Sequence, residues 1–109
     1  MYIKFFIETD DPEISKEIAY NKLNILNAGN IILEENKKYW KIESLYEVEF
    51  LIKEKIEDVY FHNFLDNIAY NWSNGDPRVY IASDTSNSCK IKEDNEKIRR
   101  CEYSENPKR

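Results

Sequence analysis

The sequence predicts a single domain with an α+β fold, and three observations lead to this prediction. The chain has 109 residues, a length at which one domain buries a core without disulfides or metals. Hydrophobic residues make up 41% and aromatic residues 14% of it, which predicts an ordered chain. Segments with the period of a strand occur together with segments that have the period of a helix. We expect residues 1–103 to form the domain and residues 104–109 to be a frayed tail.

The first third of the chain predicts a strand, a helix and a second strand. Apolar side chains alternate along residues 2–8, as in a strand of a sheet. Asp11 is an N-cap residue and Pro12 suits the first helical position, so a helix is predicted to begin there. Gly29 is placed to end this helix with a left-handed cap. Residues 30–35 are then predicted to form the second strand.

The stretch from Tyr39 to Trp72 fits two interpretations in its first half. Apolar residues alternate from Trp40 to Ile52, as in a strand, but they also fit the spacing of a buried helical stripe. Ser44 and Glu47 match a capping box, and the strand would be about twice the usual ~5–6 residues. We therefore predict a short strand over residues 38–43, paired in a hairpin through Asn36-Lys37, and a helix that starts at Ser44.

The second half of this stretch predicts another helix. A break is expected near Glu57–Asp58, and Asp58 is free to act as the N-cap. The predicted buried stripe of this helix is aromatic and aliphatic, and consists of Phe61, Phe64, Leu65, Ile68 and Trp72.

The last third predicts a turn, a strand and an extension. Residues 73–77 (SNGDP) carry a strong turn signal, and residues 78–83 alternate as a strand. Residues 89–103 fit either a hairpin, which would place Cys89 opposite Cys101, or a short helix over residues 93–100.

The predicted order of elements is strand, helix, strand, strand, helix pair and strand. This is the split β-α-β pattern of ferredoxin-like domains. We expect a ferredoxin-like-related two-layer sandwich, with a mostly antiparallel sheet, helices on one face and a C-terminal extension.

The charge of the chain is uneven. The net charge is −5, but residues 1–88 carry 9 basic and 16 acidic groups, and residues 89–109 carry 7 and 5. An acidic body attracts basic partners and speeds their encounter, although solubility alone would also account for it. The predicted strands carry no basic stripe, so we expect no direct binding to nucleic acid. No signal peptide pattern and no apolar run of ~18 residues is present, which predicts a cytoplasmic protein without membrane contact.

Catalytic groups are scarce in the sequence. His62 is the single histidine, and Cys89 and Cys101 are too widely spaced for a zinc or redox motif. Two glycines cannot form a phosphate-binding loop. We therefore expect no enzyme activity, no metal and no cofactor.

A small, acidic α+β chain without catalytic groups resembles the immunity proteins that protect bacteria from toxins, including those of contact-dependent growth inhibition. The resemblance covers size, charge and a bias toward Ile, Lys, Asn and Glu, and involves no shared motif. It implies stoichiometric inhibition of a cognate toxin, typically a nuclease, whose basic cleft is filled by acidic side chains. An alternative is a ferredoxin-like ligand-binding or regulatory domain that acts as a homodimer, and a third is an enzyme subunit.

If the acidity serves recognition, carboxylates near turns are best placed to enter the cleft of a basic partner. We predict a partner-binding set at the hairpin, in the turn, in the loop after the last predicted strand and on the outer helix face: Glu34, Glu35, Asp76, Asp84 and Asp66.

Overall fold

The computed structural model describes residues 1–74 and 78–105. The fold is α+β, as predicted from the sequence. Its elements in chain order are β1 (Tyr2–Glu8), α1 (Pro12–Leu23), a 3-10 turn η1 (Asn24–Leu26), β2 (Ile31–Lys38), β3 (Leu45–Ile52), α2 (Asp58–Ile68), β4 (Ser73–Asn74), β5 (Val79–Ser83) and β6 (Ile98–Ser104).

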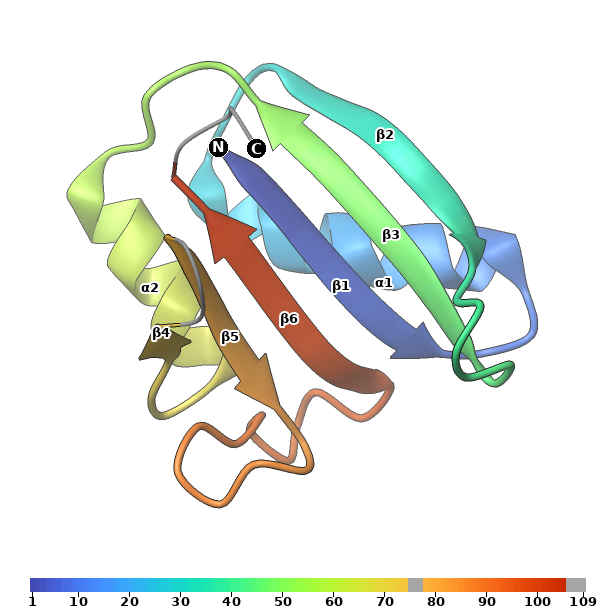
Figure 1. Ribbon diagram of the computed structural model, residues 1–109. Helices are drawn as coiled ribbons and strands as arrows, with labels where there is room; N and C mark the ends of the chain where they lie inside the picture. Colours follow the sequence, from blue (N-terminus) through green and yellow to red (C-terminus); the bar gives the residue numbers. More distant parts are fainter. Residues whose placement is uncertain (75–77, 106–109) are drawn as a thin grey trace.

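The strands form one antiparallel sheet in the order β2-β3-β1-β6-β5-β4. Figure 1 shows both helices on the same face of this sheet, with α1 crossing behind its centre. The mostly antiparallel sheet and the placement of the helices on one face are therefore confirmed. β1 lies in the interior of the sheet, and its neighbours β3 and β6 come from distant parts of the chain.

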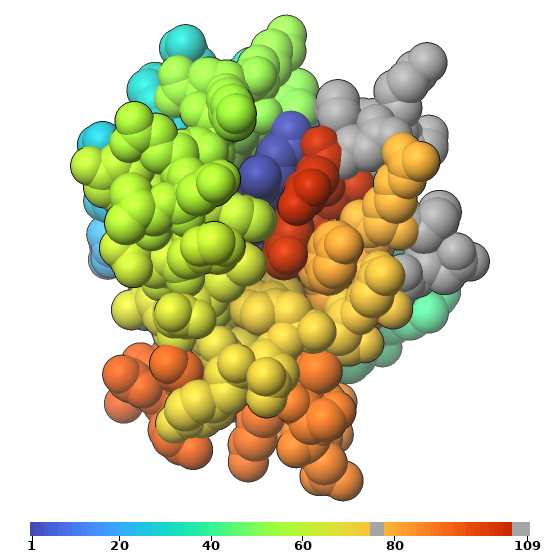
Figure 2. Space-filling model, turned by 90° about the vertical axis from the view of Figure 1, so that its left-hand side faces the viewer, coloured from blue at the N-terminus to red at the C-terminus, as the bar shows by residue number. Residues whose placement is uncertain are grey.

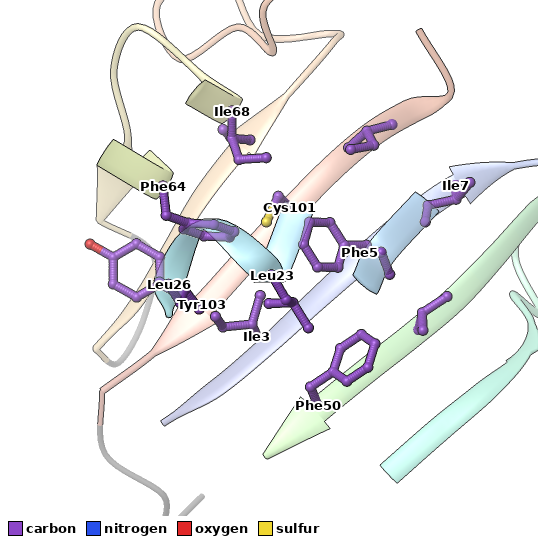
Figure 3. Close-up of a cluster of buried hydrophobic side chains, with 14 of the residues drawn as sticks. Ile3, Phe5, Ile7, Leu23, Leu26, Phe50, Phe64, Ile68, Cys101 and Tyr103 are labelled. Atoms are coloured by element: carbon purple, nitrogen blue, oxygen red, sulfur yellow. The ribbon is translucent and has the colours of Figure 1, made fainter. Parts of the chain in front are cut away.

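The core lies between the sheet and the helices. Ile3, Phe5 and Ile7 alternate along β1 as the sequence predicted, and all three are fully buried. The Phe5 ring contacts Phe50 of β3 and Phe64 of α2 edge-on, with ring centroids 6.4 and 6.3 Å apart. Figure 3 shows how side chains from β1, β3, β6 and both helices converge there. Because aromatic pairs of this geometry add to the free energy of burial, this cluster joins the two layers.

The predicted strand over residues 38–43 and the predicted helix from Ser44 are wrong. β2 continues to Lys38, residues 39–44 form the turn, and residues 45–52 form β3. β3 lies between β2 and β1, so side chains on both of its faces are buried. Because residues on both faces of β3 are buried, Leu45, Val48 and Ile52 happen to fit the spacing of a buried helical stripe. The alternation along residues 46–52 was the correct signal, and the objection to its length fails because residues 40–44 belong to the turn.

α1 begins where the sequence predicted and α2 begins at the predicted break near Glu57–Asp58, but the capping residues differ in detail. The Asp11 carboxylate accepts a hydrogen bond from the Glu13 N–H at 2.9 Å, which confirms the N-cap of α1. The left-handed residue after this helix is Asn27, with φ 53°, and not Gly29. α2 starts at Asp58, but its N-cap is Glu57, which makes no capping hydrogen bond through its side chain.

The C-terminal third forms strands and not a local hairpin. β5 confirms the predicted strand, and β6 pairs with β1 and β5. Cys101 lies opposite Phe5 and Ala82, so the predicted register with Cys89 is wrong, as is the alternative helix over residues 93–100. Both cysteines are buried and free. Ser104, which we assigned to the tail, is the last residue of β6; residues 75–77 of the predicted turn lie outside the described residues.

Candidate functional site

The turn between β2 and β3, residues 39–44, exposes two large apolar side chains. Trp40 is 80% exposed and Ile42 is 49% exposed. The backbone around them is held by two hydrogen bonds, from the Tyr39 N–H to the Leu45 carbonyl at 2.8 Å and from the Leu45 N–H to the Ile42 carbonyl at 3.0 Å. The turn therefore presents apolar side chains on a hydrogen-bonded backbone.

An aromatic contact fixes the base of this turn to the sheet. The Tyr39 ring meets the Phe6 ring of β1 edge-on, with centroids 4.9 Å apart, and its other neighbour is Trp40 at 6.3 Å. Phe6 is buried although it points away from the core face, because Lys4 and Arg100 lie over its ring at 5.9 and 5.8 Å. Such cation–π contacts favour a fixed ring position.

A cleft of about 300 Å³ adjoins the turn on the side of β6. Its wall is apolar at Ile42 and charged at Arg99. The Arg99 Nε donates to the Glu8 carboxylate at 3.0 Å, and its Nη1 lies 3.7 Å from an Asp84 oxygen. The hydrogen bond and the charge of Arg99 lower the pKa of the Glu8 carboxyl. The charges in this cleft are thus largely paired within the chain.

A second cleft of about 520 Å³ lies beside the turn, where β1 ends and α1 begins. Asp10 and Asp11 line it and are exposed, and Ile14 is 44% exposed. A hydrogen bond from the Thr9 N–H to the Ser44 carbonyl, at 3.2 Å, joins this loop to the turn. Exposed apolar side chains therefore lie close to exposed carboxylates. We define the turn surface as Trp40, Ile42, Ile14, Asp10 and Asp11.

A third hollow, of about 390 Å³, lies on the flank of the molecule. Figure 2 shows it with the first residues of the chain at its floor, between the α2 segment and the end of β6. Lysines alternate with acids along its rim, at Lys53, Glu54 and Lys55. This hollow has fewer exposed apolar side chains than the turn surface, and its charges are of both signs. The turn surface is therefore the stronger candidate for binding.

The sheet order separates most of the acids that the sequence singled out. Glu34 and Glu35 lie on β2, while Asp84 follows β5, and β3, β1 and β6 lie between these two strands. Two of these three acids have a basic neighbour, since Asp84 lies near Arg99 and Glu35 lies 3.8 Å from Lys37. The predicted acids therefore do not form one continuous patch.

The remaining two predicted acids do not join them. Asp66 is exposed on α2, in the helical layer, and Asp76 lies outside the described residues. Sequence reasoning missed Trp40 and Ile42, because it placed them within a strand. The signal that could have found them is the pair of aromatic residues between lysines in KKYWK, at the end of a strand.

Residues 1–74 and 78–105 form neither a metal site nor a membrane-spanning helix. No group of three or more His, Cys, Asp or Glu side chains there is placed to hold a metal ion, and His62 is exposed on α2. No helix in the described part of the chain combines the length and the apolar character needed to cross a membrane. Comparison with protein-family models, with curated proteins and with solved structures finds no match.

Proposed function

We propose that this protein is an immunity protein that binds a cognate bacterial toxin, a nuclease in the usual case, and inhibits it stoichiometrically in the cytoplasm. It acts by binding and not by catalysis. The observation that carries the proposal is the exposed Trp40, presented on a hydrogen-bonded turn beside two clefts. Tryptophan is among the residues that contribute most to protein–protein binding, and a rigid turn loses little conformational freedom when it binds.

The charge around the turn surface supports a basic partner. Asp10 and Asp11 are exposed beside the apolar side chains, and Glu43 is exposed within the turn itself. The net −7 of residues 1–88 provides the wider field that speeds encounter with a cationic protein. In this mechanism Trp40 and Ile42 fill an apolar depression in the toxin, while the carboxylates approach the basic residues that would otherwise hold phosphates.

In this mechanism the acids predicted from the sequence act through long-range electrostatic attraction of the partner. Glu34 and Glu35 lie on β2, Asp66 lies on α2, and Asp84 follows β5 and lines a cleft together with Ile42. In this mechanism these acids steer the partner, and not all of them contact it. Which of them faces the toxin decides the orientation of the complex.

The ferredoxin-like relationship is also a proposal. Its support is the order β2-β3-β1-β6, with α1 between β1 and β2 and α2 after β3, to which the hairpin β4–β5 is added. This order also favours the second candidate function, a ligand-binding or regulatory domain. Its ligand would occupy the cleft of about 230 Å³ between Lys22 of α1 and residues 94–98. A thermal-shift screen of small metabolites tests this function. A positive result is a ligand that raises the Tm of the wild type but not the Tm of Lys22→Ala.

The direct test of the immunity function is co-purification with the product of the gene immediately upstream, followed by binding kinetics with the purified protein. We expect a 1:1 ratio of subunits and protection of cells that express the toxin. Trp40→Ala should weaken binding by about 2 kcal/mol or more. Tyr70→Ala is the matched control, because Tyr70 is 65% exposed and, like Trp40, has a lysine over its ring. Equal effects of both variants, or no complex at all, would contradict the proposal.

The electrostatic part has its own test. Asp10→Lys/Glu43→Lys should slow association and reduce its dependence on salt, because charges at a rim act mainly on the association rate. Asp11 is left unchanged because it caps α1. The same measurement on Glu34→Lys/Glu35→Lys, and separately on Asp66→Lys, shows whether the β2 side or the α2 side of the protein faces the toxin. If no reversal changes the rate or the salt dependence, the acidity serves solubility, and the mechanism of phosphate mimicry is wrong.

A further inference from the structure

The outer edge of β2 is the long free edge of the sheet. β2 has eight residues and pairs only with β3, whereas β4, at the opposite edge, has two residues. Within the described residues, no other strand lies along β2, which is visible as the outermost long arrow in Figure 1. A free edge presents unpaired N–H and C=O groups to any strand that approaches it.

The side chains along the second half of β2 have a fixed arrangement. Asn36 points to the helical layer, where its Oδ1 accepts a hydrogen bond from Ser15 at 2.8 Å and its Nδ2 donates to the Pro12 carbonyl at 2.9 Å. Because side chains alternate between the faces of a strand, Glu35 and Lys37 both project from the opposite face. Their charged atoms lie 3.8 Å apart, in agreement with this placement.

The order of charges around Asn36 is self-complementary. Two glutamates precede this residue and two lysines follow it, in the order Glu34, Glu35, Asn36, Lys37 and Lys38. In an antiparallel pairing of two copies with the two-fold axis at Asn36, Glu35 of one copy lies opposite Lys37 of the other, on the same face. The symmetry repeats this pair on the other side of the axis.

We propose that a second copy of this chain docks on the outer edge of β2, antiparallel and with the two-fold axis at Asn36, so that two sheets join into one. Opposite charges directly across an antiparallel ladder stabilise it, and like charges weaken it. The charged pairs are confined to residues 35–37, since the ladder to β3 is irregular between Leu33 and Glu35. Trp40 lies outside the paired segment, and the two copies of the turn over residues 39–44 lie at opposite ends of the joined strands. The dimer does not depend on toxin binding.

Other pairings of the same edge satisfy the charges less well. A two-fold axis at Lys37 would set this lysine against its own symmetry copy, and an axis between Glu35 and Asn36 would oppose side chains from different faces. A parallel pairing would set each charge beside its like. The contacts of Asn36 with Ser15 and Pro12 fix the face on which each neighbouring side chain lies. With the faces fixed, the charges favour the register centred on Asn36.

Sedimentation velocity over a range of concentrations at low salt tests the dimer. We expect a reversible monomer–dimer equilibrium for the wild type, weakened by salt. Glu35→Lys alone, and Lys37→Glu alone, should each raise the dissociation constant at least about tenfold, because both symmetric pairs become repulsive. Asp66→Lys makes the same change of charge on α2 and should leave the constant unchanged.

Two experiments that restore opposite charges distinguish a lost contact between chains from damage to the fold. The double variant Glu35→Lys/Lys37→Glu regains opposite charges at both positions and should dimerise like the wild type. An equimolar mixture of the two single variants should form a heterodimer, because each lysine then meets a glutamate across the axis. Repulsion within each chain persists in this mixture, so only contact between chains explains a recovery.

The same measurements can overturn the proposal. Lysines on an exposed edge also occur as a device that prevents association. If that is their role here, the wild type stays monomeric up to millimolar concentration, and Lys37→Glu leaves it monomeric or increases association. A dimer whose constant is unchanged in both single variants, or two single variants that do not recover on mixing, would place the interface elsewhere.

Discussion

Ser15 of α1 donates a hydrogen bond to the Asn36 side chain of β2 across 2.8 Å, although the two residues are 21 positions apart in the chain. The Asn36 amide in turn donates to the Pro12 carbonyl at the start of the same helix. Ser15 is fully buried and Asn36 is partly buried. This small network holds the edge strand of the sheet against the helical layer.

We predict that Ser15→Ala lowers the free energy of unfolding by about 1–2 kcal/mol, because the partly buried Asn36 oxygen loses its donor. Urea unfolding followed by circular dichroism measures the change. Ser44→Ala is the control, since Ser44 is exposed on the turn, and it should change stability by less than about 0.5 kcal/mol. Equal losses in both variants would show that the network does not stabilise the fold.

The two tryptophans should behave differently when each is truncated. Trp72 is partly buried, donates from Nε1 to the Leu65 carbonyl at 3.2 Å and contacts the Tyr103 ring at 5.2 Å. Trp72→Ala should therefore cost about 2–3 kcal/mol, below the ~3–5 kcal/mol of a fully buried aromatic residue. Trp40→Ala should cost less than about 0.5 kcal/mol.

Fluorescence quenching provides an independent measurement of the same difference. Acrylamide should quench the emission of Trp72→Phe, which retains the exposed Trp40, more strongly than that of Trp40→Phe. The opposite ranking would contradict the exposures described above.

Asn95 connects the end of α2 to the loop before β6. Its Nδ2 donates to the carbonyls of Asn67 and Ile68 at 3.0 and 3.1 Å. Carbonyls at the end of a helix have no partner within the helix. The Ile68 carbonyl keeps the Lys92 N–H at 2.9 Å but the Asn67 carbonyl loses its donor, so Asn95→Ala should cost about 1–2 kcal/mol in urea unfolding. Asn87→Ala, at an exposed loop position, is the control. A loss below about 0.5 kcal/mol for Asn95→Ala would mean that water replaces the amide.

Tyr103 links stability to alkaline pH. Burial raises the pKa of its phenol from 10.0 to about 12. The unfolded chain therefore loses this proton at lower pH than the folded protein does. The contribution to stability is complete below pH 10.0, and it falls as the pH rises toward about 12.

Tyrosinate absorbance in wild type and Tyr103→Phe locates this titration, and urea unfolding at a series of pH values measures its effect on stability. The decline between pH 10.0 and about 12 should be smaller in Tyr103→Phe. An identical decline in both proteins would assign the effect to other groups, such as the Cys101 thiol, whose pKa is also raised by burial.

Local signals in the sequence identified the elements that depend mainly on near neighbours. The cap at Asp11, the strand around Phe5 and the start of α2 at Asp58 were all predictable from a few adjacent residues. β3 was not, because its place between β2 and β1 buries residues on both faces, Leu45 as well as Val48. The alternation of a strand was present, but Leu45, Val48 and Ile52 also fitted a helical stripe, and adjacent residues alone could not decide between the two patterns.

The candidate site was less predictable for the same reason. Glu35 lies within one strand and Asp84 directly follows another, and the sequence alone does not show how far apart the two strands are. The sheet places three strands between them. Trp40 appeared to belong to a strand because it begins the alternation that runs to Ile52, and because the turn was placed at Asn36-Lys37, inside β2, which ends at Lys38. Which loops come together depends on the order of strands, and this order is set by contacts between distant residues such as the Phe5–Phe50 and Phe5–Phe64 pairs.

The place of β6 beside β1 has a consequence during synthesis on the ribosome. β1 leaves the ribosome first, but one of its edges is filled only when residues 98–104 have been made. Until then Phe5 and its neighbours lack part of their cover, and the nascent chain exposes an apolar edge to chaperones or to other nascent chains. Late closure also means a long average separation between contacting residues, which slows folding.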